Sequence, residues 1–191
     1  MIEILTYGKM LAKHGYVEAN LGNISKKIDD EHILISGKGI PLDQLGILTV
    51  HKIKNDINNI PKEASSESIV HLSIYALTKT EAIIHTHPLY AVVLSLTLGR
   101  YKSTLYPEDE EGVYYLKDIP SVIGASGSSE LAYNVSQALK ERKCVLVRGH
   151  GLFAIGDSLE EAYNITLMVE HSCKIKYLKD MYFSHDSKTP T

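Results

Sequence analysis

The chain has 191 residues, 44% of them hydrophobic, and a formal net charge of −3, which fits one compact domain with a full core. It has no run of roughly 18 apolar residues that could cross a membrane and no signal-peptide layout at its start, so we expect a cytoplasmic protein. Scattered basic residues and the absence of tryptophan argue against a nucleic-acid groove, so the expected partner is a small molecule.

The first half of the chain predicts one helix followed by short strands. Apolar residues at helical spacing predict a helix over residues 2–14, which Gly15 ends. Strands separated by polar turns are expected over residues 23–28, 32–36 and 47–54, with a fourth beyond Asn55-Asp56. Such closely spaced strands favour an antiparallel meander.

The second half predicts helices that alternate with buried strands. Ser65-Ser66 opens a helix that precedes a strand over residues 81–85, and Pro88 starts a helix that runs to Leu98. Apolar spacing then predicts a helix that ends near Lys143, strands over residues 144–147 and 152–155, and a long last helix after a capping box at 158–161. We therefore expect an α/β layered fold with a mixed or antiparallel sheet, in a single domain over residues 1–183 with a frayed tail over 184–191.

Three histidines form a candidate metal site. The strand that ends at His85 has a period of two residues, so His85 and His87 point to the same face and can share one ion. His150 is flanked by glycines and follows a second apolar run, so it also emerges at a strand end. Three neutral imidazoles leave one tetrahedral position open, as catalytic zinc requires. An ordinary core or surface histidine is the alternative for each of them, and the spacing does not force His150 to lie beside His85.

Glu67 is the candidate base. It follows two serines at a helix start, where a first-turn glutamate is common for reasons of helix electrostatics alone. Beside the three histidines it becomes a candidate fourth metal ligand, which a substrate could displace to leave a free carboxylate. His71 lies one helical turn further along the same face, as a candidate hydrogen-bond partner behind the site.

Three polar segments rich in glycine or serine could bind an anion. Backbone N–H groups and hydroxyls in such segments suit a phosphate, and a lysine adds a positive charge. Each segment alone is more often an ordinary turn, so the prediction depends on their joint placement before the metal strand. The candidate phosphate ligands are Asn23, Ser36, Lys38, Gly39, Ser65 and Ser66.

A tyrosine is the candidate proton donor. A phenol with an ordinary pKa near 10 can donate a proton to a developing alkoxide. Tyr106 precedes Pro107 in a loop after the metal strand and is our candidate. On the residues alone, Tyr114 and Tyr115 are as good.

Taken in order, five short motifs resemble those of the class II aldolase/adducin family. They are Gly22-Asn23-Ile24-Ser25, Ser36 to Gly39 followed by Ile40-Pro41, Ser65-Ser66-Glu67, His85-Thr86-His87 and Gly149-His150-Gly151. The likeness spans roughly residues 7–178 and is closest to the branch that acts on L-fuculose 1-phosphate. It implies a three-layer αβα domain with a central, mostly antiparallel sheet, assembled as a cyclic homotetramer with sites between neighbouring subunits.

The same resemblance implies a role for each candidate residue. His85, His87 and His150 would bind Zn2+, Glu67 would be the base, and Tyr106 would serve a neighbouring subunit. Asn23, Ser65 and Ser66 would hold the phosphate with the loop over residues 36–39. The implied function is a zinc-dependent aldolase that cleaves a ketose 1-phosphate to dihydroxyacetone phosphate and an aldehyde. Lys38 departs from the family pattern, which usually has a small hydroxyl residue there.

Three other functions of the same fold stay open at this point. A methylthioribulose-1-phosphate dehydratase shares the three histidines and a glutamate. A ribulose-phosphate 4-epimerase uses the same metal, but that branch would have an aspartate where this chain has Glu67. An adducin-like interaction module keeps the fold without chemistry, and the retained histidines argue against it, since a module has no use for an open metal site.

Overall fold

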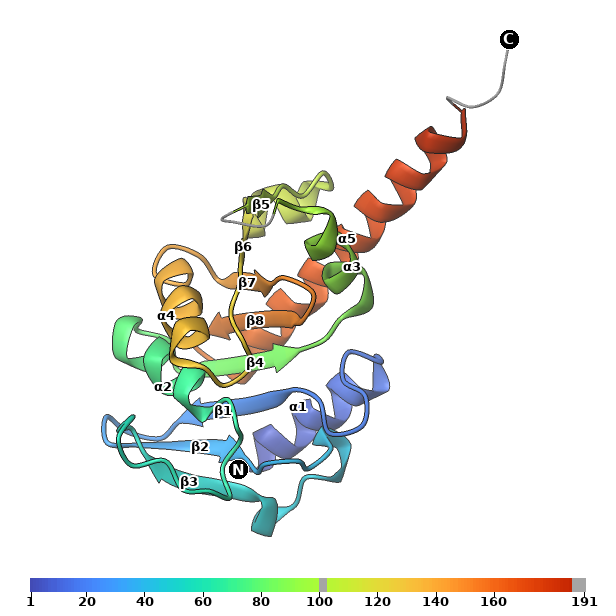
Figure 1. The fold of residues 1–191 in the computed structure, drawn as a ribbon. Coiled ribbons are helices and arrows are strands. Elements are labelled where there is room, and N and C mark those ends of the chain that lie inside the picture. Colours follow the sequence, from blue (N-terminus) through green and yellow to red (C-terminus); the bar gives the residue numbers. More distant parts are fainter. Residues whose placement is uncertain (100–102, 187–191) are drawn as a thin grey trace.

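An eight-stranded sheet forms the centre of the computed structural model, which describes residues 1–99 and 103–186 (Figure 1). The strand order is β3-β2-β1-β4-β8-β7-β6-β5, and among the described pairs only β6 and β7 are parallel. The strands are β1 (Asn23–Lys27), β2 (His32–Ser36), β3 (Val50–Lys54), β4 (Ala82–Thr86), β5 (Ser103–Leu105), β6 (Ile119–Val122), β7 (Cys144–Val147) and β8 (Gly151–Gly156).

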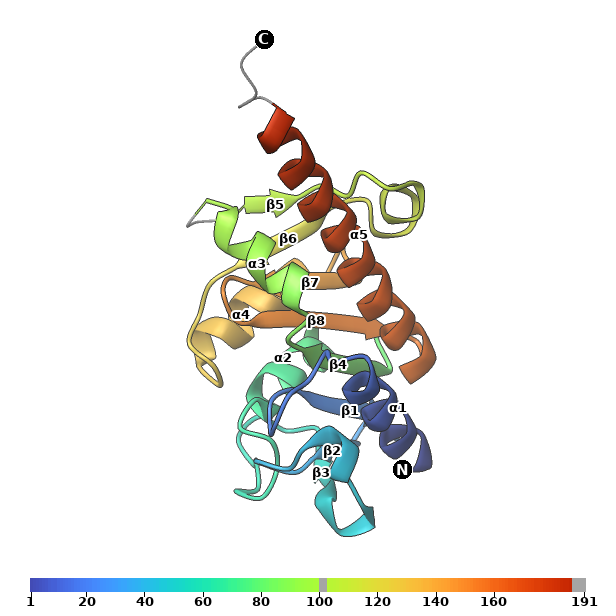
Figure 2. The same ribbon diagram turned by 90° about the vertical axis from the view of Figure 1, so that its right-hand side faces the viewer.

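Helices cover both faces of this sheet (Figures 1 and 2). They are α1 (Ile2–Lys13), α2 (Ser68–Leu77), α3 (Leu89–Thr97), α4 (Ser129–Ala138) and α5 (Leu159–Asp186). Two successive residues of β4 show the two layers: Ile83 packs in a core with α2 and α4, and Ile84 packs in a core with α1 and α5. Helix α3 completes the second face with α5. The predicted three-layer αβα fold with a mostly antiparallel sheet is therefore confirmed.

Some predicted element boundaries are wrong. No strand forms directly beyond Asn55 in the described chain, because the Asp56 carboxylate accepts the backbone N–H of Asn58 and the segment turns. Residues 47–49 form a 3-10 helix rather than the start of β3. Helix α4 ends at Ala138, before Lys143, and α5 continues through Asp186, into the segment expected to fray. Residues 187–191 lie outside the described residues.

The region between α3 and α4 holds elements that the sequence did not predict. Strand β5 has three residues, β6 contains Pro120, and a π-helix spans Gly112–Leu116. None of these has the length or periodicity on which sequence patterns depend. None of the described helices is both long and apolar enough to span a membrane.

Helix α3 is capped from another part of the chain. Its N-cap residue, Pro88, makes no side-chain cap hydrogen bond. The Glu170 carboxylate of α5 instead accepts the N–H groups of Tyr90 (3.0 Å) and Ala91 (2.9 Å), which would otherwise lack partners in the first turn. Burial nevertheless raises the pKa of Glu170, against the effect of these N–H groups. This contact fixes α3 directly after the segment that ends in His87.

Candidate metal and catalytic site

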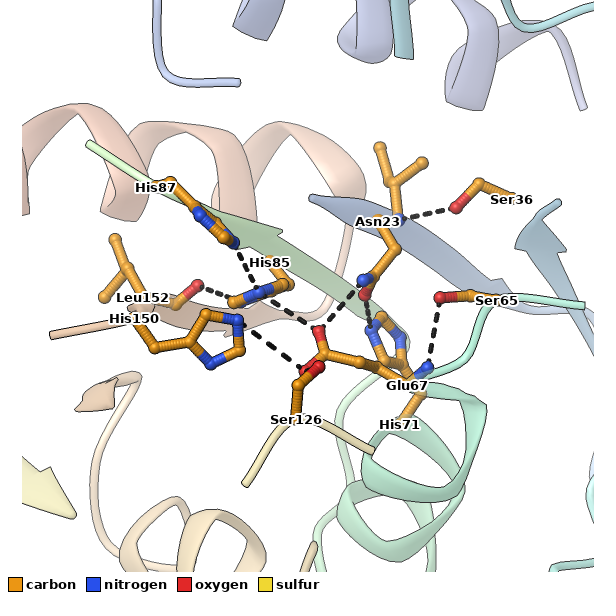
Figure 3. A network of polar contacts seen from close by, with 11 residues as sticks. Asn23, Ser36, Ser65, Glu67, His71, His85, His87, Ser126, His150 and Leu152 are labelled. Atoms are coloured by element: carbon orange, nitrogen blue, oxygen red, sulfur yellow. Dashed lines mark hydrogen bonds and ion pairs between the residues drawn. The ribbon is translucent and has the colours of Figure 1, made fainter. Parts of the chain in front are cut away.

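Three histidines converge at one end of the central strands (Figure 3). His85 lies in β4, His87 follows that strand, and His150 lies in the turn between β7 and β8. Their candidate ligand nitrogens all lie within 4.8 Å of one another. Strand β8 pairs with β4 so that Leu152 lies opposite Thr86, which brings the β7–β8 turn beside the end of β4. Pairing across the sheet therefore supplies the third histidine, which the spacing in sequence could not place.

Hydrogen bonding and burial prepare these imidazoles for a metal. The Nδ1 of His85 lies 3.0 Å from the carbonyl oxygen of Leu152, which can only accept, so Nδ1 carries the proton and Nε2 keeps its lone pair. Burial, helped by the neighbouring imidazoles, lowers the pKa of His87 to about 3, and burial also lowers the pKa of His85. Neutral imidazoles with free lone pairs are the form that binds a metal.

Gly151 leaves the room that the histidines need. A Cβ atom at this position would lie 2.4 Å from the carbonyl oxygen of Thr86 and 3.0 Å from ring carbons of both His85 and His87. The first distance is shorter than any contact a real Cβ makes, so a side chain here must push β4 and its imidazoles away. The glycine after His150 is therefore required by packing against the metal strand.

We expect Gly151→Ala to weaken metal binding by roughly 10- to 100-fold, the range for changes in the groups that orient metal ligands. Competition with a chelating dye would measure the affinity. Gly46→Ala is the matched control, since a Cβ there meets nothing within 4 Å. Equal affinities of the two variants would show that the close packing at Gly151 does not matter to the site.

Glu67 faces the histidines from the N-cap position of α2. Its side chain is almost fully buried, and its Oε2 lies 3.1 Å from Nε2 of His85 while its Oε1 lies 3.9 Å from Nε2 of His150. Asn23 donates to Oε2 (3.0 Å) and the Ser126 hydroxyl donates to Oε1 (2.9 Å). Both carboxylate oxygens are thus held in place.

The environment keeps Glu67 ionised. Burial raises the pKa of its carboxyl group, but His85, the Asn23 amide, His150 and the Ser126 hydroxyl together outweigh burial and lower the pKa to about 2. The result is a buried carboxylate beside three imidazoles, a group that can bind a cation or take up a proton.

A small cavity of about 100 Å³ lies over this cluster. Two helices begin at it, since Ser65-Ser66 precede α2 and Ser126 precedes the N-cap of α4. Helix N-termini carry partial positive charge and free N–H groups, so the cavity favours an anion. The residues that line the cavity are Asn20, Leu21, Gly22, Asn23, Gly37, Gly39, Ser65, Ser66, Glu67, His85, His87, Ser126 and His150.

Some predicted phosphate ligands do not line the cavity. Ser36 is buried and accepts a hydrogen bond from the backbone N–H of Ile24, so it joins β1 to β2. The side chain of Lys38 is exposed, and its backbone N–H donates to the carbonyl of Glu63. Lys38 nevertheless belongs to the loop whose glycines form one wall.

Tyr106 lies away from this site in its own chain. It follows β5, its side chain is 65% exposed, and it does not line the cavity. Tyr114 and Tyr115 also do not line the cavity and are exposed in the π-helix.

The sequence analysis missed Ser126. Its signal was present, because the serine- and glycine-rich run over residues 124–129 joins β6 to α4. Gly127 in this run adopts a positive φ of 67°, and a Cβ there would lie 2.7 Å from the carbonyl oxygen of Ser66. The run therefore packs directly against the residues that precede Glu67.

Comparisons with known proteins agree with this geometry. Residues 2–177 match the family described as Class II Aldolase and Adducin N-terminal domain. The chain is 30% identical over 180 residues to an L-fuculose phosphate aldolase of Methanococcus maripaludis, which covers 93% of this chain and 96% of that protein. It is 28% identical over 200 residues to a methylthioribulose-1-phosphate dehydratase of Schizosaccharomyces japonicus, with coverage of 93% and 85%.

A solved structure is also similar. The crystal structure of L-fuculose-1-phosphate aldolase from Thermus thermophilus superposes with a TM-score of 0.89 at 32% identity, covering 98% of this chain and 96% of that one. These relatives are enzymes by name, so the expectation of an enzyme rather than an interaction module is confirmed. The chain belongs to the class II aldolase and adducin family.

Proposed function

We propose that this protein is a zinc-dependent aldolase that cleaves a ketose 1-phosphate, of the L-fuculose 1-phosphate type, into dihydroxyacetone phosphate and an aldehyde. The observation that carries the proposal is the convergence of three imidazoles and one ionised carboxylate at a cavity where two helices begin. Relatives named L-fuculose phosphate aldolase cover nearly the whole chain and support the same reaction class.

The donor set of the site fits zinc. His85, His87 and His150 each offer one ring nitrogen, and Glu67 offers a carboxylate oxygen, a set of nitrogen and oxygen ligands that Zn2+ accepts. When bound, zinc supplies Lewis-acid polarisation of the substrate's carbonyl and hydroxyl oxygens.

Glu67 is proposed to move the proton at C3 of dihydroxyacetone phosphate. Its carboxylate is ionised, buried and held on both oxygens, by Asn23 and by Ser126. A base held in this way loses little freedom when substrate binds, and exclusion of water strengthens its interaction with the reacting carbon.

Residues before α2 are proposed to hold the phosphate. Ser65, Ser66, Asn23 and Gly39 line one side of the cavity, and the N-terminus of α2 adds partial positive charge. Lys38 lies beside Gly39, and a flexible lysine side chain can bring its charge toward an anion held there.

Lys38→Ala is expected to raise KM several-fold while kcat changes little, because the phosphate is bound alike in the ground and transition states. Steady-state kinetics with a phosphorylated ketose would show the split. Lys62, an exposed lysine before Ala64, provides the control as Lys62→Ala. An unchanged KM in Lys38→Ala would mean that the phosphate is neutralised by other groups.

Tyr106 is proposed to donate a proton to the aldehyde oxygen of a neighbouring subunit in a cyclic homotetramer. Its exposure, and its absence from the lining of the cavity in its own chain, suit a residue that completes another subunit's site. Sedimentation of the purified protein would test the assembly.

Incubation of the zinc-loaded protein with a panel of ketose 1-phosphates tests the function directly. An aldolase releases dihydroxyacetone phosphate, which a coupled reduction detects. A methylthioribulose-1-phosphate dehydratase is the second candidate, favoured by the 28% identity over 93% of the chain to such an enzyme. It would instead give a diketone phosphate with no dihydroxyacetone phosphate, and that result would overturn the proposal.

A further inference from the structure

A chain of buried polar side chains leads from Glu67 into the core beneath α2, and Figure 3 shows its first members. Asn23 donates to Glu67 at 3.0 Å, and Nε2 of His71 lies 2.6 Å from Oδ1 of Asn23. The Ser25 hydroxyl then lies 2.7 Å from Nδ1 of His71 and 2.8 Å from the Tyr75 hydroxyl. All five side chains are buried, and His71 is completely so.

The carboxylate at one end fixes the direction of every hydrogen bond in this chain. Its oxygens only accept, so the amide nitrogen of Asn23 faces Glu67 and the amide oxygen faces His71. That oxygen also only accepts, so Nε2 of His71 carries the proton. A completely buried histidine is neutral, which leaves Nδ1 to accept from Ser25, and the Ser25 oxygen accepts from Tyr75.

We infer that His71 is a positioning residue for Glu67 that acts through Asn23. Its Nε2 proton holds the Asn23 amide in the one orientation that offers N–H to the carboxylate. If the amide turned over, it would place its oxygen against the Glu67 oxygens, and the carboxylate would be pushed from its place beside His85. The inference deepens the proposed function, since it takes Glu67 as the base of that reaction.

Simple core filling does not explain this arrangement. His71 contacts Phe153 edge to face, with ring centroids 6.0 Å apart, and an apolar side chain of similar size could make that contact. An apolar residue could not donate a hydrogen bond to Asn23, so the buried amide oxygen of Asn23 would lose its partner. Each nitrogen of the His71 ring forms a hydrogen bond, Nε2 to Asn23 on the side of Glu67 and Nδ1 to Ser25 on the far side.

The first test reads the tautomer directly and needs no activity. In the ¹⁵N-labelled, zinc-loaded protein, long-range proton–nitrogen spectra should show His71 neutral, with the proton on Nε2 and a bare Nδ1. A His71 ring with its proton on Nδ1 would reverse the direction of these hydrogen bonds and overturn the inference. This result stands even if the substrate differs from the one proposed.

The second test compares two replacements of His71. His71→Leu keeps the volume but cannot donate, and we expect kcat for exchange of the C3 proton of dihydroxyacetone phosphate to fall roughly 10- to 100-fold. His71→Gln offers an amide N–H in place of Nε2 and should restore most of that rate. Zinc content should stay near the parent value in both variants, because neither replacement changes His85, His87 or His150.

Ile74→Val is the control for general loosening of α2, since Ile74 is fully buried on that helix and takes no part in the polar chain. It should leave the exchange rate near that of the parent. Equal losses in the Leu and Gln variants, or a folded Leu variant with the parent rate, would refute positioning by His71. If His71→Leu does not fold, the exchange rate of His71→Gln and the tautomer of His71 in the parent protein test the inference. A parent protein that exchanges no proton would refute the proposed function instead.

Discussion

Replacement of Glu67 by glutamine is expected to lower kcat by about 100-fold or more, while zinc stays bound. Glutamine keeps the size of the side chain and its place at the start of α2 but removes its basicity, and general bases contribute on the order of 100- to 10,000-fold. Three histidines can hold a metal ion without the carboxylate. Steady-state cleavage of the ketose phosphate gives kcat, and elemental analysis gives the zinc content.

Exchange of the C3 proton of dihydroxyacetone phosphate with solvent deuterium isolates the step proposed for Glu67, since it needs no aldehyde. Glu63→Gln serves as the control, because Glu63 is an exposed glutamate shortly before the same helix. An exchange rate in Glu67→Gln equal to the parent rate would show that another group is the base and that the proposed mechanism is wrong.

His85→Ala is expected to abolish stoichiometric metal binding and with it the activity. His85 is the most buried of the three histidines, at 1% exposure, and its Nε2 lies 3.0 Å from Nε2 of His87. Its loss leaves two imidazoles and a carboxylate, with a cavity where the central ligand stood. Elemental analysis after dialysis measures the bound metal.

His32→Ala is the control for this experiment, since His32 pairs with Asp29 at the surface, away from the site. It should keep one metal ion per chain and full activity. Full metal occupancy in His85→Ala would contradict the assignment of the histidine cluster as the metal site.

The sequence predicts some parts of the fold and of the candidate site better than others, for physical reasons. His85 and His87 follow from a strand period of two residues, which is a local rule. His150 does not, because the pairing of β8 with β4 places it, and no local pattern encodes that pairing. The resemblance between ordered motifs supplied this missing information.

The errors of the sequence analysis share a cause. Ser126 and the segment around β5 and β6 lie in short, irregular stretches whose structure depends on packing against distant residues. The loop that contains Lys38 lies beside the cavity, as predicted. The sequence alone does not reveal that the Lys38 side chain is exposed and does not line the cavity. Patterns predict elements well and the directions of individual side chains poorly.

The pairing of β4 with β8 closes one of the long loops of the fold, as the contact between His85 and Leu152 spans 67 positions. Long loops cost more entropy to close than hairpins, so such contacts form slowly. Glu67 precedes β4 in the chain and His150 directly precedes β8, so the two residues meet only when this pairing has formed. A partly folded chain therefore has no assembled site, and metal ions act as ligands of the native state alone. At a concentration 100 times Kd, such a ligand adds about 2.7 kcal/mol to the free energy of unfolding, which couples the supply of metal to the lifetime of the folded enzyme.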